Sequence, residues 1–291
     1  MQHGLRILGL MLLLLCSSGG ARAEVEHHSL WRVAGRHNVV YLLGSVHMLK
    51  TDASTLPAVA IDAYHAADLL MMELDPTEVT VDDQRAITRL RMLPRGRTLA
   101  KALGPALYAQ YQAQALPLGI NTDHLSRFQP WYAALILDQV ALARAGYASD
   151  AGVDNQIASL ARADGKLIIE LETYREQLGF FARLSIAEQR KYVRASLEDT
   201  GTLESDAATL VDAWKQGDAA AMEEAMRDQH EESPKLFRRL TVERNRRWLP
   251  RIVDLLNRRE NALVVVGAMH LVSSDGIVAM LQARGYEVQQ Q

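Results

Sequence analysis

The sequence has a single cysteine, Cys16, and it lies in the apolar stretch at the start of the chain. An intrachain disulfide is therefore excluded. No long run of like charge occurs and the formal net charge is only -3, so nucleic acid is not predicted as a partner. No glycine-rich nucleotide fingerprint is present. Beyond the first residues, no run approaches the roughly 20 apolar residues of a membrane-spanning helix, so we expect no stable membrane insertion.

The first residues have the pattern of a secretory signal. A basic residue precedes an apolar run over 7–15, and small residues follow up to Ala23. We predict a signal peptide over 1–23, cleaved near Ala23, and hence a periplasmic or secreted protein of residues 24–291. A lipid anchor on Cys16 is the weaker alternative, because a bulky leucine takes the place where lipoprotein signals carry a small residue.

Short apolar runs predict five β-strands, at 39–43, 69–74, 167–171, 262–266 and 286–288. Helical patterns lie between several of them, with expected caps at Ser54 or Thr55 and at Ser273 or Ser274, and glycines where helices end. Such alternation favours a mainly parallel sheet covered by helices. The segment 30–43 has the pattern of a β-hairpin, which we place at the edge of the sheet.

The rest of the chain is helical by pattern, over about 98–116, 130–145, 186–197, 204–216, 219–231 and 234–258. We predict an α/β fold in which a mainly parallel sheet with flanking helices carries a large α-helical insertion. The domain would cover 24–291, with the mostly helical insertion at about 95–160 and 180–258.

Two of the predicted strands lead into the same motif, Gly-x-x-His. The stretch VVYLLGSVHML at 39–49 delivers His47, and ALVVVGAMHLV at 262–272 delivers His270. In parallel sheets, ligands bind beyond the carboxyl ends of the strands, so both imidazoles are expected in one crevice. The glycine in each motif allows the backbone to approach a ligand closely.

Carboxylates follow two further strands. Glu73 ends the run LLMMELDP, and Glu170 and Glu172 lie two apart in LIIELET, with Glu172 nearer the strand end. Histidine and carboxylate side chains are ligands for a divalent metal, which lowers the pKa of bound water. The structural alternatives are a carboxylate that caps a turn, for Glu73, and a salt bridge to a helix, for Glu172.

Two other features permit more than one interpretation. The segment ERNRRW at 243–248 places Arg244, Arg247 and Trp248 on one helical flank, as an anion clamp or as an ordinary basic surface. Ser45 lies close to His47, but the Gly-x-Ser-x-Gly elbow of serine hydrolases is absent.

Five motifs in order resemble the TraB/GumN family, which includes the Tiki metalloproteases that cut Wnt proteins. They are VVYLLGSVHML, DLLMMELDP, KLIIELETYREQL, ERNRRWLPRI and ALVVVGAMHLVSSDGIVAMLQARGYEV, and the resemblance covers about residues 30–289. It implies a fold like that of erythromycin esterase and the haem-binding ChaN proteins. It also implies a centre built from two Gly-x-x-His motifs, a glutamate and an Arg-Asn pair, here His47, His270, Glu73, Arg244 and Asn245.

These observations together predict a metal-dependent hydrolase, with a peptide or protein as its substrate. His47, His270 and Glu73 would hold Mn, Co or Zn, while Glu73, Arg244 and Asn245 would take part in catalysis. Two alternatives stay open. One is a haem- or metal-binding protein without catalysis. The other is a metal-independent esterase that uses histidine and glutamate as acid and base.

Overall fold

A computed structural model describes residues 27–53, 55–199, 201–232 and 234–291. The predicted signal peptide over 1–23, its cleavage near Ala23, and the Ser54 cap lie outside the described residues. Within the described part of the chain, no helix is both long enough and apolar enough to cross a membrane.

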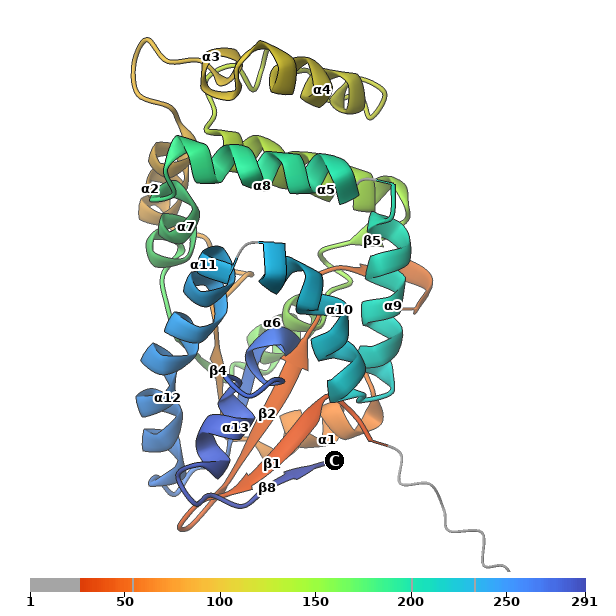
Figure 1. The fold of residues 1–291 in the computed structure, drawn as a ribbon. Helices are drawn as coiled ribbons and strands as arrows, with labels where there is room; N and C mark the ends of the chain where they lie inside the picture. Colours follow the sequence, from red (N-terminus) through yellow and green to blue (C-terminus); the bar gives the residue numbers. More distant parts are fainter. Residues whose placement is uncertain (1–26, 54, 200, 233) are drawn as a thin grey trace, which may run out of the picture.

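The centre of the molecule is a six-stranded sheet in the spatial order β6-β4-β7-β2-β1-β8 (Figure 1). Its strands are β1 (Leu30–Ala34), β2 (Val39–Ser45), β4 (Leu69–Met72), β6 (Leu167–Glu170), β7 (Ala262–Gly267) and β8 (Val288–Gln290). Strands β2, β7, β4 and β6 are parallel, and β1 is antiparallel to both of its neighbours. The predicted α/β class with a mainly parallel sheet is confirmed.

The predicted hairpin is present, but it is not at the edge of the sheet. β1 pairs with β2 across a turn in which the Gly35 N–H donates to the Asn38 carbonyl at 3.0 Å. The last strand, β8, then pairs with the free side of β1. The edge position was wrong because β8 covers β1.

Helices flank the sheet, and β4 and β7 are buried along their whole length, as expected for strands covered on both faces. These helices are α1 (Ala58–Ala66), α6 (Val153–Asp164), α12 (Glu243–Leu256) and α13 (Ile277–Gln282). α6 ends as predicted at Gly165, which has a positive φ of 66°.

The two predicted helix caps that can be checked are wrong. α1 begins directly after Pro57, without a side-chain cap. α13 begins only after Gly276, because the Gly276 N–H closes a turn on the carbonyl of Ser273 at 3.1 Å.

The remaining predicted helices form layers beyond one end of the sheet and beside it (Figure 1). They are α3 (Leu99–Leu103), α4 (Pro105–Ala115), α5 (Pro130–Arg144), α8 (Ile186–Asp199), α9 (Leu203–Lys215), α10 (Ala219–Glu232) and α11 (Pro234–Phe237). In Figure 1, α3 and α4 lie farthest from the sheet, with α5 and α8 beneath them. These four helices share their own apolar cluster, which includes Leu99, Tyr111, Leu137 and Val193.

Two of the predicted helices are interrupted. The helix expected over 98–116 breaks at Gly104, which has a φ of 82°, and restarts at Pro105. The helix expected over 234–258 contains a π-helical turn at Arg238–Val242, between α11 and α12. Such turns often occur at functional sites.

Two helices and a small sheet escaped prediction. α2 (Val81–Arg91) and α7 (Tyr174–Ala182) each begin with a reciprocal capping box, from Thr80 and from Thr173. The short strands β3 (Leu49–Lys50) and β5 (Tyr147–Ala148) pair with each other.

Candidate active site at the strand ends

Four parallel strands end side by side, and a polar side chain follows each one. In their order across the sheet, these side chains are Glu172 after β6, Glu73 after β4, His270 after β7 and His47 after β2. The carboxyl edge of the sheet therefore brings together both predicted histidines and the predicted glutamate. The helix α12 adds Arg244 and Asn245 from one side.

Arg244 joins the two carboxylates. Its Nη2 donates to Glu73 Oε2 and, at 2.5 Å, to Glu172 Oε1, and its Nε donates to Glu172 Oε2 at 3.2 Å. All three side chains are at least nine-tenths buried. Arg247 Nη2 also reaches Glu172 Oε2, at 3.0 Å. Buried charges of this kind are tolerated because each is paired and hydrogen-bonded.

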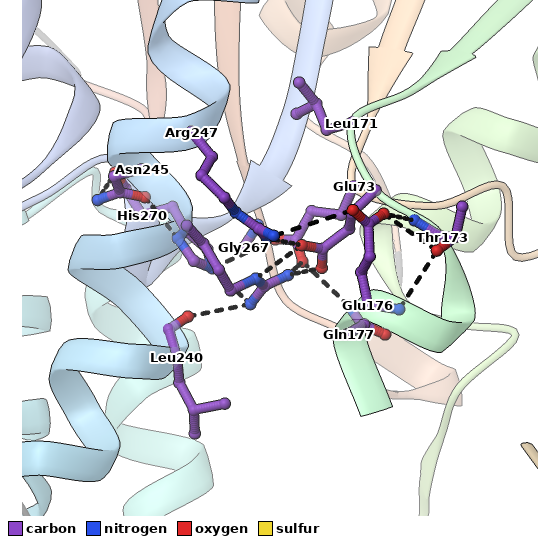
Figure 2. A network of polar contacts seen from close by, with 12 residues as sticks. Glu73, Leu171, Thr173, Glu176, Gln177, Leu240, Asn245, Arg247, Gly267 and His270 are labelled. Atoms are coloured by element: carbon purple, nitrogen blue, oxygen red, sulfur yellow. Dashed lines mark hydrogen bonds and ion pairs between the residues drawn. The ribbon is translucent and has the colours of Figure 1, made fainter. Parts of the chain in front are cut away.

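Glu73 is held as a carboxylate. Its Oε1 accepts the Gly267 N–H at 2.7 Å, and its Oε2 accepts Gln177 Nε2 at 3.3 Å (Figure 2). Burial alone would raise the pKa of Glu73, but Arg244, the two histidines and the Gly267 N–H lower it to about 2. Glu73 is therefore ionised at neutral pH.

Asn245 fixes the tautomer of His270. The Asn245 amide nitrogen donates to the carbonyls of His270 and Asp275. Its Oδ1 is therefore the acceptor for His270 Nδ1, at 2.6 Å (Figure 2). We infer from this network that Nδ1 carries the proton. The lone pair of Nε2 then faces the site, where Arg244 Nη1 donates to it at 3.0 Å.

His270 is held neutral by its surroundings. Burial, together with the positive charges of Arg244 and His47, lowers the pKa of His270 to about 3. The negative charge of Glu73 acts in the opposite direction but is outweighed. Its ring lies 4.5 Å from that of Trp248, centroid to centroid, and the Arg244 guanidinium lies over the same tryptophan. The predicted flank of α12 is therefore part of the site.

His47 lies in the turn between β2 and β3, and Asp154 of α6 positions it. Its Nδ1 is 3.2 Å from Asp154 Oδ2. The His47 side chain is 62% exposed, but it lies in a cavity. The surrounding protein atoms partly desolvate the ring, and this desolvation opposes a positive charge on it. The hydrogen bond and charge of Asp154, with Glu73 beyond it, nevertheless raise the pKa of His47 to about 9.

Gly267 marks the point on which these groups converge. A β-carbon at this residue would lie 3.3 Å from Glu73 Oε1, 3.6 Å from His270 Cδ2 and 3.6 Å from His47 Nε2. Its backbone, with φ of -49° and ψ of 136°, is open to any residue, so the effect of the glycine is to leave space beside Glu73.

Some features of the site suit a metal ion, and others do not. Each imidazole is held at Nδ1 by a side chain, which is how metal-binding histidines are oriented. Glu73 supplies a carboxylate beside them. However, within the described part of the chain no three His, Cys, Asp or Glu side chains form a ready ligand set. His270 Nε2 and Glu73 are both bonded to Arg244 and would have to turn toward a metal. His47, with its pKa raised to about 9, would have to lose a proton to bind one.

A cavity of about 620 Å³ opens above this edge of the sheet. Ser45, Glu73, Arg244 and both site histidines line its polar end. Apolar side chains from α5, α7, α8 and the π-helical turn also line it, among them Leu135, Leu178, Phe181, Tyr192 and Leu240. The helical layers therefore give the polar site an apolar wall.

A family model described as the TraB/PrgY/gumN family matches residues 29–290. The chain belongs to this family. It is 25% identical to the uncharacterized protein YbaP of Shigella flexneri over 251 residues, which is 85% of this chain and 88% of that protein. The uncharacterized YbaP of Escherichia coli K12 is also 25% identical, over 83% of this chain and 87% of its own length. No solved structure matches the chain significantly.

Sequence reasoning about this TraB/PrgY/GumN protein left some of the site unresolved. Of the two candidate glutamates at the end of β6, Glu172 joins the site, whereas the exposed Glu170, the last residue of the strand, accepts the N–H of Asp75 at 3.0 Å. Asp154 and Gln177 were missed. No local pattern marks them, because they reach the site only through the packing of α6 and α7.

The neutral His270 predicts that this family member loses stability in acid. The pKa of His270 is lowered in the folded state, so between about pH 6.5 and pH 3 the unfolded chain binds a proton at this residue and the folded chain does not. The free energy of unfolding should therefore fall as the pH drops from about 6.5 toward 3. Urea unfolding of the wild type and His270→Gln at several pH values measures this, and an equal slope in both proteins would contradict it.

Proposed function

We propose that this TraB/PrgY/GumN protein is a peptidase that uses a divalent metal, Mn, Co or Zn, and acts in the periplasm or outside the cell. The observation that carries the proposal is the convergence beside Gly267. There, Glu73 Oε1 and His47 Nε2 face one point with His270, and both imidazoles are held in place at Nδ1. His47, His270 and Glu73 would hold the ion.

The metal would polarise the scissile carbonyl and lower the pKa of a bound water. The protein's own groups divide the remaining work. Arg244 keeps Glu73 ionised, so that its carboxylate can bind the ion or accept a proton from water. Asn245 keeps the lone pair of His270 Nε2 turned toward the site. Glu172 and Arg247 hold Arg244 in position.

The cavity wall supports a substrate with a large apolar side chain beside the scissile bond. Phe181 of α7 and Tyr192 of α8 lie in ring contact in this wall, at 5.9 Å between centroids. An apolar group gains free energy when it leaves water for such a surface. A bulky apolar side chain of a peptide would fill this part of the cavity while its carbonyl reaches the polar edge.

The metal content of the protein tests this function. We expect about one equivalent of Mn, Co or Zn in protein purified without chelator, and loss of this metal in both His47→Ala and His270→Ala. Elemental mass spectrometry gives the content, and circular dichroism shows whether each variant is folded. His65→Ala is the matched control, because His65 lies on α1, away from the cavity, and it should keep the metal.

A peptide library with varied side chains then tests the chemistry. Cleavage that stops on addition of chelator and returns with metal supports the peptidase. Absence of metal after incubation with each ion would overturn the metal-dependent mechanism. A Soret band on titration with haem, without cleavage of any peptide, would favour a carrier instead.

The position of Arg244 supports a second candidate, a metal-independent esterase. Its guanidinium already places a buried positive charge against Glu73 and His270 Nε2, which are two of the three proposed ligands. In that case a protonated histidine, His47, would act as the acid and the ionised Glu73 as the base on a substrate beside this charge. Hydrolysis of an ester panel at an unchanged rate in excess chelator would favour this candidate over the metal peptidase.

A further inference from the structure

Ser45 is a buried hydroxyl at the edge of the site. It is the last residue of β2, and only 4% of it is exposed. In the part of the chain that the structure describes, its Oγ has no hydrogen-bond partner. A buried hydroxyl without a partner is unfavourable, and in native structures it calls for an explanation.

The register of the sheet shows where this hydroxyl points. Met72 and Val265 are paired across β4 and β7, and both line the cavity. Gly267 is two residues beyond Val265, so it has the same facing, and Ser45 is its partner on β2. Ser45 therefore faces the side on which a β-carbon of Gly267 would meet Glu73 and the histidines, and it lines the same cavity.

The surroundings of Ser45 do not suit a nucleophile. An attacking serine needs a base that accepts its proton. No described side chain hydrogen-bonds to Ser45 Oγ, and the Nδ1 of the neighbouring His47 is engaged with Asp154. A hydroxyl can still donate a hydrogen bond to an oxygen of a bound molecule, and this role needs no base because the proton stays on the serine.

We propose that Ser45 is a further catalytic residue, whose Oγ–H donates a hydrogen bond to the carbonyl oxygen of the substrate as that oxygen becomes negative. This inference rests on the proposed hydrolase function. A donor fixed on a strand beside the reacting group stabilises the transition state more than the bound substrate.

The matched variants Ser45→Ala and Ser45→Thr test the proposal with the best substrate of the library. We expect Ser45→Ala to lower kcat by roughly 100-fold with little change in KM, in line with the loss of one oxyanion donor. Ser45→Thr keeps the hydroxyl and should retain most of the activity. Metal content should be the same in all three proteins.

Thermal unfolding separates this role from a structural one. Ser45→Ala removes a buried hydroxyl without a partner, so its Tm should equal or exceed that of the wild type. An unchanged kcat in Ser45→Ala would overturn the proposal. So would a fall in activity that follows a lowered Tm, because the hydroxyl would then be structural.

A binding measurement covers the case in which the wild type cleaves nothing, so that the proposed function fails. Benzylphosphonate is the probe, since its apolar ring suits the cavity and its anionic oxygens resemble the transition state. Calorimetric titration should show at least fivefold weaker binding to Ser45→Ala than to the wild type. Equal affinity, or no binding to either protein, would overturn the role of Ser45 independently of cleavage.

Discussion

Replacing Arg244 by methionine is expected to lower the free energy of unfolding by about 3–5 kcal/mol, the usual effect of removing one partner from a buried ion pair. Glu73 and Glu172 would then remain as two buried carboxylates without the guanidinium that bridges them. The pKa of Glu73 should rise from its low value, because Arg244 is the main group that lowers it. Urea unfolding at pH 7 measures the loss of stability.

Arg247→Met is the matched control. The Arg247 side chain is 44% exposed and contacts Glu172 at the rim, so its loss should cost less than about 1 kcal/mol. Adding Glu172→Gln to Arg244→Met removes one of the two buried carboxylate charges that have lost Arg244, and it should restore part of the stability. If both arginine variants proved equally stable, the buried bridge would have no special role.

If the protein is the proposed peptidase, Gly267→Ala should lower its kcat/KM by up to about 100-fold, the scale of loss expected when reacting groups are displaced by about one ångström. The added methyl group would lie 3.3 Å from Glu73 Oε1 and 3.6 Å from His47 Nε2, at the point where these groups converge. The backbone at Gly267 suits alanine, so the Tm should change little. Steady-state kinetics and thermal unfolding measure the two quantities.

The glycine of the other motif supplies the control. A β-carbon at Gly44 would lie 3.2 Å from Ala268 Cα and Cβ and 3.4 Å from the carbonyl of Ser29, away from the reacting groups. Gly44→Ala should therefore lower the Tm while the folded protein keeps its activity. Full activity in Gly267→Ala would show that the space beside Gly267 is not used.

The strand ends of the site were predictable from the sequence, whereas the links between them were not. Buried parallel strands are continuous apolar runs, so β2, β4 and β7 could be found together with the polar residues that follow them. The edge strand β6 is partly exposed, but its short apolar run also marks it in the sequence. The bridge from Arg244 to Glu73 and Glu172 depends on how α12 packs against the sheet, and no local pattern encodes that packing.

The helix predictions failed for two different reasons. The capping boxes at Thr80 and Thr173 and the Gly104-Pro105 break are local signals that were present in the sequence. The π-helical turn before α12 has no such signal. The carbonyl of Leu240 in this turn accepts Arg244 Nη1 at 3.1 Å, while the same guanidinium reaches Glu73 and Glu172 across the tertiary structure.

The position of β7 governs when the site can exist. This strand lies in the middle of the sheet, between β4 and β2, although it is encoded close to the end of the chain. Val39 and Asn261, which are hydrogen-bonded where β2 and β7 begin, are 222 residues apart. Pairings between such distant segments form slowly. A chain still being synthesised has Glu73 and His47 but lacks the strand that joins them, so this cluster of side chains cannot assemble until almost the whole polypeptide has emerged.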